Sequence, residues 1–149
     1  MSAIAVVFDA SVALKWFHAV DEQEVVEART LLAEHRAGHI AGMSLDLLPY
    51  ELGNALSRRG LSPVEVGNLL GRLHDLLPLV TPDAGELGLA ARLAAQHRLS
   101  FYDASYAAVA RTLSERVLVT ADAALIRARL GVTASEAVAE LERTGGDEG

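Results

Sequence analysis

Two acidic residues follow apolar runs that are typical of buried strands in a parallel sheet. Asp9 comes directly after residues 4–8, and Asp122 comes two residues after residues 117–120. Ligands of such sheets bind at the carboxyl ends of the strands, so we expect both side chains at one edge of the sheet. Taken alone, each acid has a simpler interpretation as the N-cap of the helix that follows it.

Two further acidic residues lie in stretches that are otherwise apolar. Glu51 lies in a predicted helix and has Asn54 three residues on, which places both side chains on one helical face. Asp103 lies at the start of a segment rich in alanine. Taken singly, each also fits the ordinary role of a first-turn acid that complements the helix dipole.

The four acids together indicate a metal site. Four separate segments each bring one carboxylate to a helix N-terminus, and like charges at close range raise one another's pKa. A hard divalent cation such as Mg²⁺ or Mn²⁺ relieves that repulsion, because both ions prefer oxygen ligands. The chemistry that suits such a site is phosphodiester hydrolysis, in which the metal polarises the phosphate and activates a bound water.

The elements that must position these acids alternate between strands and helices, which predicts an α/β fold with a mainly parallel central sheet. We expect one domain over residues 1–144 and a disordered tail over residues 145–149. The predicted strands are 4–8, 39–43, 79–81 and 117–120. The predicted helices are 11–17, 22–37, 49–59, one behind a capping box at 62–65, 86–98, 102–115, 122–130 and 134–143.

Composition excludes several classes of function. The chain of 149 residues has 13 basic and 20 acidic residues, a net charge of −7, and no cysteine. Thiolate metal sites, disulfides and cysteine nucleophiles are therefore ruled out. The negative charge argues against passive electrostatic binding of nucleic acid, but not against a nucleic-acid enzyme whose acids hold a metal. Because no apolar run approaches the ~18 residues of a membrane span, we expect a soluble cytoplasmic protein without a membrane partner.

Four segments of the sequence resemble the acidic motifs of PIN domains, in the same order and over nearly the whole chain. Within that family, the length and the motif set resemble the VapC toxins of bacterial VapBC toxin–antitoxin pairs. The segments are 7–11, Glu51 with Asn54, 102–104 with Tyr106, and 118–122.

The resemblance implies a three-layer α/β/α fold and a Mg²⁺- or Mn²⁺-dependent endoribonuclease. It implies metal ligation, direct or through water, by Asp9, Asp103 and Asp122, with Glu51 as a further acid of the catalytic site. The implied partners are an RNA substrate, a VapB-like antitoxin and a second copy of the chain.

Three polar residues are expected to support the acids. Ser11 and Thr120 stand where the PIN family often has a hydroxyl close to its acids. Asn54 is expected to orient Glu51, as residues behind metal ligands commonly do.

A second interpretation stays open, in which the chain is a non-catalytic PIN-like module that binds RNA or protein. Metal dependence distinguishes the two, since a binding module would not need Asp9. Phosphoryl-transfer domains with an acidic pocket fit poorly, because Asp9 is followed by Ala10 and Ser11, and Lys15 is the only lysine.

Three other features have two interpretations each. Trp16 and Phe17 can stack on bases, but we favour a place in the core or at a partner contact. The helix at 134–143 follows a weak final strand at 132–133, and either completes the fold or contacts a partner. Two helices carry enough leucines to leave an apolar groove for an antitoxin or a second copy, unless they simply fill the core: Leu52, Leu56, Leu61, Leu69, Leu70, Leu73, Leu76 and Leu77.

Overall fold

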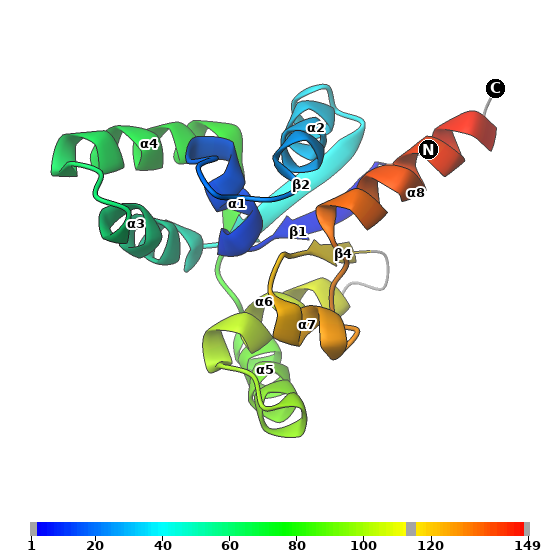
Figure 1. Ribbon diagram of the computed structural model, residues 1–149. Coiled ribbons are helices and arrows are strands. Elements are labelled where there is room, and N and C mark those ends of the chain that lie inside the picture. The colour runs from blue at the N-terminus through cyan, green and yellow to red at the C-terminus, as the bar shows by residue number, and fades with distance from the viewer. Residues whose placement is uncertain (1–2, 113–115, 148–149) are drawn as a thin grey trace.

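A four-stranded parallel sheet forms the centre of the molecule (Figure 1). The structure, a computed structural model, describes residues 3–112 and 116–147. The strand order is β3-β2-β1-β4, and every neighbouring pair is parallel. The α/β class with a mainly parallel sheet is thus confirmed. The strands are β1 (Ile4–Phe8), β2 (Ile40–Leu45), β3 (Leu79–Val80) and β4 (Arg116–Val119).

The weak final strand expected near residue 132 is present as a single bridge beside β4. Val132 pairs in parallel with Val119. Its N–H donates to the Leu118 carbonyl at 2.9 Å, and its carbonyl accepts from the Thr120 N–H at 2.9 Å. This bridge fixes the backbone of Thr120, which lies just beyond the end of β4.

Side chains alternate between the two faces of the sheet, as the pleat of a strand requires. On β1, Val6 and Phe8 join one apolar core, whereas Val7 joins the other. On β4, Val119 belongs to the first core and Leu118 to the second. Both faces are therefore covered, and the strands are short continuous apolar runs for that reason.

Helices cover both faces and complete three α/β/α layers (Figure 1). The helices of the first face are α1 (Ala10–Phe17), α2 (Val25–Arg36), α3 (Leu48–Arg58), α4 (Pro63–Leu76) and α8 (Ala134–Asp147). The helices of the second face are α5 (Ala84–His97), α6 (Phe101–Thr112) and α7 (Ala123–Arg127).

Helix α2 begins at Val25, three residues later than the sequence predicted, because the preceding segment makes other contacts. Lys15 is buried in α1 and its ammonium donates to the Glu22 carboxylate at 3.1 Å and to the Gln23 carbonyl at 2.6 Å. Glu24 then takes a left-handed backbone conformation, with φ of 54°. These contacts hold residues 22–24 outside the helix.

The C-terminal helix differs in length from the prediction and packs on its own domain. Helix α8 continues to Asp147, so residues 145–147 are helical where a disordered tail was predicted; residues 148–149 lie outside the described part. Ala134 is buried, and Val138 and Leu141 pack against the first core. The Ser135 N–H also donates to Glu24 at 3.0 Å. The inner face of α8 thus completes the fold.

Two apolar features that the sequence left open belong to the core. Trp16 is 8% exposed, meets Phe8 edge to face at a ring distance of 5.0 Å, and donates to the Ala28 carbonyl at 2.9 Å. The leucines of α3, α4 and the residues that flank them pack against the first core, four of them buried and four partly buried: Leu52, Leu56, Leu73 and Leu77, and Leu61, Leu69, Leu70 and Leu76. An apolar groove that binds an antitoxin or a second copy stays a prediction.

Within residues 3–112 and 116–147, no helix combines the length and the apolar character that crossing a bilayer requires.

Candidate active site

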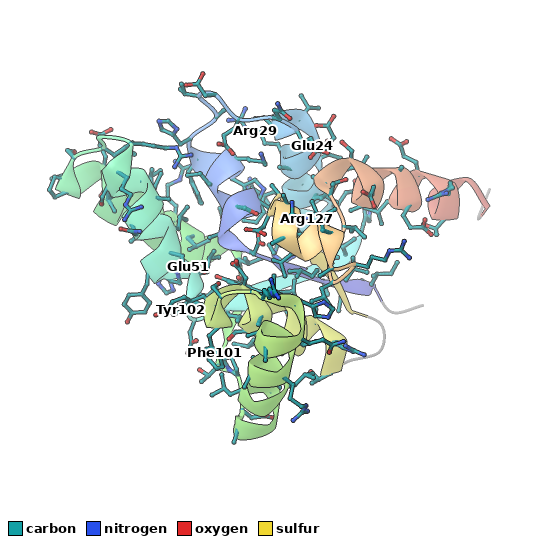
Figure 2. The ribbon with its side chains drawn as sticks, turned by 60° about the horizontal axis from the view of Figure 1, so that its bottom comes forward. Glu24, Arg29, Glu51, Phe101, Tyr102 and Arg127 are labelled. Carbon is teal, nitrogen blue, oxygen red and sulfur yellow. The ribbon has the colours of Figure 1, made fainter. Side chains whose placement is uncertain are left out.

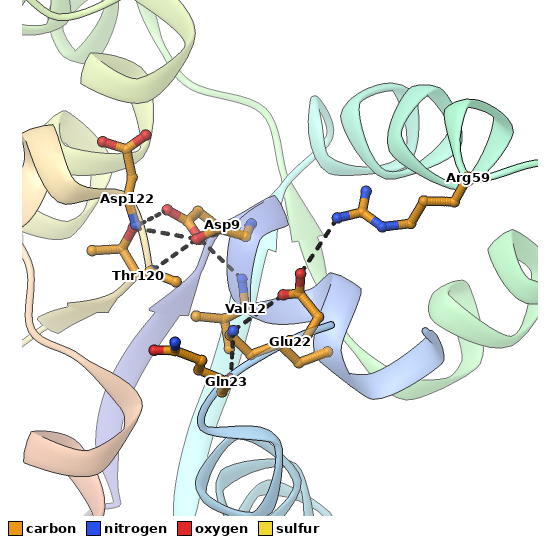
Figure 3. A network of polar contacts seen from close by, with 10 residues as sticks. Asp9, Val12, Glu22, Gln23, Arg59, Thr120 and Asp122 are labelled. Atoms are coloured by element: carbon orange, nitrogen blue, oxygen red, sulfur yellow. Dashed lines mark hydrogen bonds and ion pairs between the residues drawn. The ribbon is translucent and has the colours of Figure 1, made fainter. Parts of the chain in front are cut away.

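Asp9 lies at the carboxyl end of the central strand, and its carboxylate is held from several sides (Figure 3). It is the N-cap of α1, and its Oδ1 accepts from the backbone N–H groups of Ser11 at 3.1 Å and Val12 at 3.3 Å. The Ser11 hydroxyl donates to the same oxygen at 2.5 Å, and the Thr120 hydroxyl donates to Oδ2. The simple interpretation of Asp9 as a cap is therefore correct, but it accounts for only part of these contacts.

Burial dominates the electrostatics of Asp9. The residue is 3% exposed, and removal from water raises the pKa of its carboxyl from 3.8 to about 6. The hydrogen bonds from Ser11, Thr120 and Val12 lower this pKa, and the charge of Asp103 raises it further. A carboxyl this far from its ordinary pKa costs stability when ionised, which is typical of functional sites.

Ser11 and Thr120 connect the beginning of α1 to the end of β4. The Ser11 hydroxyl accepts from the Ala121 N–H at 2.8 Å, and the Thr120 hydroxyl accepts from the Asp122 N–H at 3.0 Å. Both hydroxyls also donate to Asp9. The structure thus places both hydroxyls against Asp9, and each one ties Asp9 to the segment that carries Asp122.

Glu51 lies in the first turn of α3, and a tyrosine from the opposite layer holds it. The Tyr106 hydroxyl, on α6, donates to Glu51 Oε1 at 2.7 Å. Burial raises the pKa of Glu51, the Tyr106 bond lowers it, and the charge of Asp103 raises it again. The sequence assigned the orienting role to Asn54, but Asn54 is exposed and makes no hydrogen bond to Glu51 in the described part of the chain.

Asp103 and Asp122 complete the set from two further segments. Asp103 is in the first turn of α6, where burial and then the charge of Asp122 raise its pKa. Asp122 is the N-cap of α7, and its Oδ1 accepts from the N–H groups of Ala124 at 2.9 Å and Leu125 at 3.2 Å. Like Asp9, Asp122 combines a capping role with a place in the acid cluster.

The four acids therefore share one electrostatic environment, with Asp103 at its centre. The Asp103 charge raises the pKa of both Asp9 and Glu51, and Asp122 does the same to Asp103. Since the interaction between charges falls with distance and with solvent screening, these effects on pKa indicate that each of the three interacting pairs lies close in space. We call these four residues the acid cluster.

The chemistry of the acid cluster fits a divalent cation. All four side chains are carboxylates, which are the ligands that Mg²⁺ and Mn²⁺ prefer, and a cation would offset their mutual repulsion. Within residues 3–112 and 116–147, no three acidic or histidine side chains already stand in a metal-binding arrangement. A bound ion would therefore need small side-chain movements or bridging waters, and Mg²⁺ commonly retains several waters in proteins.

Comparison with known proteins agrees with this geometry. The PIN domain family matches residues 6–130, and the chain therefore belongs to the PIN domain family. The crystal structure of PAE2754 from Pyrobaculum aerophilum superimposes with a TM-score of 0.67 at 26% identity, over 94% of this chain and 96% of that one. VapC20 of Mycobacterium tuberculosis, a toxin that cleaves the sarcin–ricin loop, superimposes with a TM-score of 0.65 at 21% identity, over 83% and 94%. No curated protein sequence matches the chain.

Tyr106 is the residue whose role sequence reasoning missed. It is 1% exposed and lies among alanines, where a tyrosine is ordinarily core. The spacing could have indicated this role, because Tyr106 is three residues after Asp103 and so shares its helical face. A buried hydroxyl needs a partner, and the acids were the polar groups expected nearby.

Proposed function

We propose that this PIN domain is a metal-dependent endoribonuclease that hydrolyses RNA phosphodiester bonds at the acid cluster. The observation that carries the proposal is that four separate segments each bring a carboxylate into one connected region. Thr120 ties Asp9 to the segment of Asp122. Tyr106, three residues after Asp103 on α6, holds Glu51 of α3. Buried or half-buried acids gathered in this way are typical of functional sites. Family membership supports a nuclease, because PIN domains are typically metal-dependent nucleases.

In this proposal Asp9, Asp103 and Asp122 hold Mg²⁺ or Mn²⁺, directly or through water, and Glu51 supplies a further acid. When bound, the ion polarises the phosphate and lowers the pKa of a water molecule. Ser11 and Thr120 would keep the Asp9 carboxylate in one orientation.

Tyr106 is a positioning residue in this proposal. Its hydroxyl fixes one oxygen of Glu51 and leaves the other available to a water or the cation. Because the hydrogen bond also lowers the pKa of Glu51, it favours the ionised form that metal binding requires.

We further propose that the chain acts as the toxin of a type II toxin–antitoxin pair. The shared fold with VapC20 and the membership of the PIN family support this role. The corresponding partners would be an RNA substrate, a VapB-like antitoxin and a second copy of the chain, all in the cytoplasm. Growth arrest on expression, relieved by co-expression of the antitoxin, is the expected behaviour.

Cleavage of total RNA by the purified chain tests the nuclease proposal. We expect discrete fragments with Mg²⁺ or Mn²⁺, none with EDTA, and none from Asp9→Asn. Glu142→Gln is the matched control and should leave cleavage unchanged. Glu142 is exposed on α8, where the neighbouring Leu141 lines a pocket with Ile4 at the start of β1, the end opposite to Asp9. Cleavage that persists in EDTA or in Asp9→Asn would contradict the proposed chemistry, and RNA binding without cleavage would favour the non-catalytic module.

A further inference from the structure

Three exposed aromatic residues directly precede two of the acids in the sequence. Tyr50 directly precedes Glu51 and is 79% exposed, and Tyr102 directly precedes Asp103 and is 59% exposed. Phe101, which precedes Tyr102 on α6, is 45% exposed. In the part of the chain that the structure describes, every exposed aromatic ring belongs to this group, which we call the aromatic rim.

The helices that carry the rim meet at the acid cluster. Tyr102 and Tyr106 are four residues apart on α6 and so lie on one face of the helix. Since the Tyr106 hydroxyl bonds to Glu51, that face is turned toward the beginning of α3, where Tyr50 lies. In Figure 2, Tyr102 and Phe101 of α6 appear on the side of the molecule on which Glu51 is labelled. The part of the rim on α6 therefore lies on the helix that brings Asp103 and Tyr106 to the acid cluster.

Tyr50 also lines a groove at the same edge of the sheet. The groove has a volume of about 510 Å³, and its walls include Pro49, His74 and Pro78. This volume is within the ~300–1,000 Å³ range of small-molecule sites. The lining consists of two aromatic rings, two prolines and two leucines beside the Asp46 carboxylate, and its apolar part suits a planar group such as a nucleobase.

The charge of the chain makes such contacts important for holding RNA. With 13 basic and 20 acidic residues, the protein offers RNA little overall electrostatic attraction. Base stacking on aromatic rings does not depend on protein charge and accepts any base, because every base has a π-face. We propose that the aromatic rim binds the bases of single-stranded RNA on either side of the cleaved bond; this inference rests on the proposed ribonuclease function.

Binding by a cleavage-deficient chain tests the proposal separately from catalysis. In an Asp9→Asn background with Mg²⁺, the probe is a short single-stranded oligoribonucleotide of mixed sequence. It contains a base analogue whose fluorescence is quenched by stacking. We expect Tyr50→Ala and Tyr102→Ala each to weaken binding by about 5- to 30-fold and to reduce quenching. Tyr50→Phe and Tyr102→Phe keep the ring and should stay within about twofold of the parent.

Two matched controls and a salt series complete the test. Val26→Ala and Val64→Ala truncate residues that are 74% and 72% exposed on other helices, and should leave binding unchanged. Affinity should fall only weakly with salt, unlike binding through phosphates.

Each contrary result has a distinct meaning. Equal affinity of the alanine variants and the parent would overturn the stacking proposal while leaving cleavage by the wild-type chain intact. The stacking proposal would also be overturned if the phenylalanine variants lost as much affinity for the oligoribonucleotide as the alanine variants. No binding by the Asp9→Asn chain together with no cleavage by the wild-type chain would overturn the ribonuclease function, and the stacking proposal with it.

Discussion

Replacing Asp9 by Asn should make the metal-free protein more stable at high pH and slightly less stable at low pH. Burial raises the pKa of Asp9 from 3.8 to about 6, so the folded state disfavours the ionised carboxyl. Protonated Asp9 therefore contributes to the free energy of unfolding. This contribution is fully present below pH 3.8 and is lost as the pH rises through about 6. A shift of this size corresponds to about 3 kcal/mol.

The hydrogen bonds of Asp9 reduce the gain that Asn can bring. Asn retains an oxygen that accepts from Ser11 and Val12, but its NH₂ group cannot accept from the Thr120 hydroxyl. Losing that bond costs about 1 kcal/mol. We therefore expect Asp9→Asn to be roughly 2 kcal/mol more stable than wild type at pH 8 and roughly 1 kcal/mol less stable at pH 4.

Urea denaturation in EDTA at both pH values measures this difference, and comparing variant with wild type cancels most of the titration of other groups. Val64→Ala serves as the control and should show the same difference from wild type at both pH values, because valine does not titrate and this side chain is 72% exposed. A difference between Asp9→Asn and wild type that does not change from pH 4 to pH 8 would refute the electrostatic reasoning.

Four further outcomes are expected. Tyr106→Phe removes the hydrogen bond that lowers the pKa of Glu51, so the acidic limb of the cleavage pH profile should move to higher pH; an unchanged profile would separate Glu51 from the reaction. Thr120→Val removes a donor to Asp9 and should weaken Mg²⁺ binding by roughly 10- to 100-fold, measured by calorimetry against the Thr120→Ser variant. Mg²⁺ at about 100 times its Kd should stabilise the wild-type chain by about 2.7 kcal/mol in thermal unfolding and leave Asp9→Asn nearly unaffected. Gly131→Ala should lower the free energy of unfolding by about 1–3 kcal/mol, because its Cβ would lie 2.8 Å from the Thr120 methyl group; wild-type stability would show that the loop yields instead.

The positions of Asp9 and Asp122 were predictable because each follows a strand of unmistakable composition. Short runs rich in valine and isoleucine predict buried parallel strands, and the rule for the carboxyl edge then places both acids together. The structure agrees, and Thr120 links the two. The local sequence pattern and the parallel topology are therefore enough to predict where these two acids lie.

The partner of Glu51 was not predictable in the same way, because it depends on packing between layers. Asn54 shares a helical face with Glu51, and local spacing therefore favoured it. The hydroxyl that reaches Glu51 comes instead from Tyr106, 55 positions away on a helix of the opposite layer. Only the approach of α6 to α3 brings the two together, and periodicity carries no information about that approach.

The predicted start of α2 was wrong for a similar reason. The sequence placed the start of α2 at residue 22, but buried Lys15 takes Glu22 and Gln23 as its partners. Burying the Lys15 ammonium without partners would cost more free energy than adding residues 22–24 to the helix would contribute. Glu22 also pairs with Arg59 at 3.3 Å, so the segment joins α1 to the end of α3 (Figure 3).

The long separation between the residues that hold Asp9 has a consequence for synthesis of the chain. Asp9 directly follows β1, whereas Thr120 is 111 positions later and is fixed by a bridge to Val132 that is translated later still. At ~5–20 residues per second, roughly 6 to 22 s pass between the translation of Asp9 and that of Thr120. A nascent chain therefore cannot assemble the acid cluster until the segment that carries Thr120 and Asp122 has been translated. Under the proposed function, a cell is protected from a half-made nuclease by the order of its strands alone.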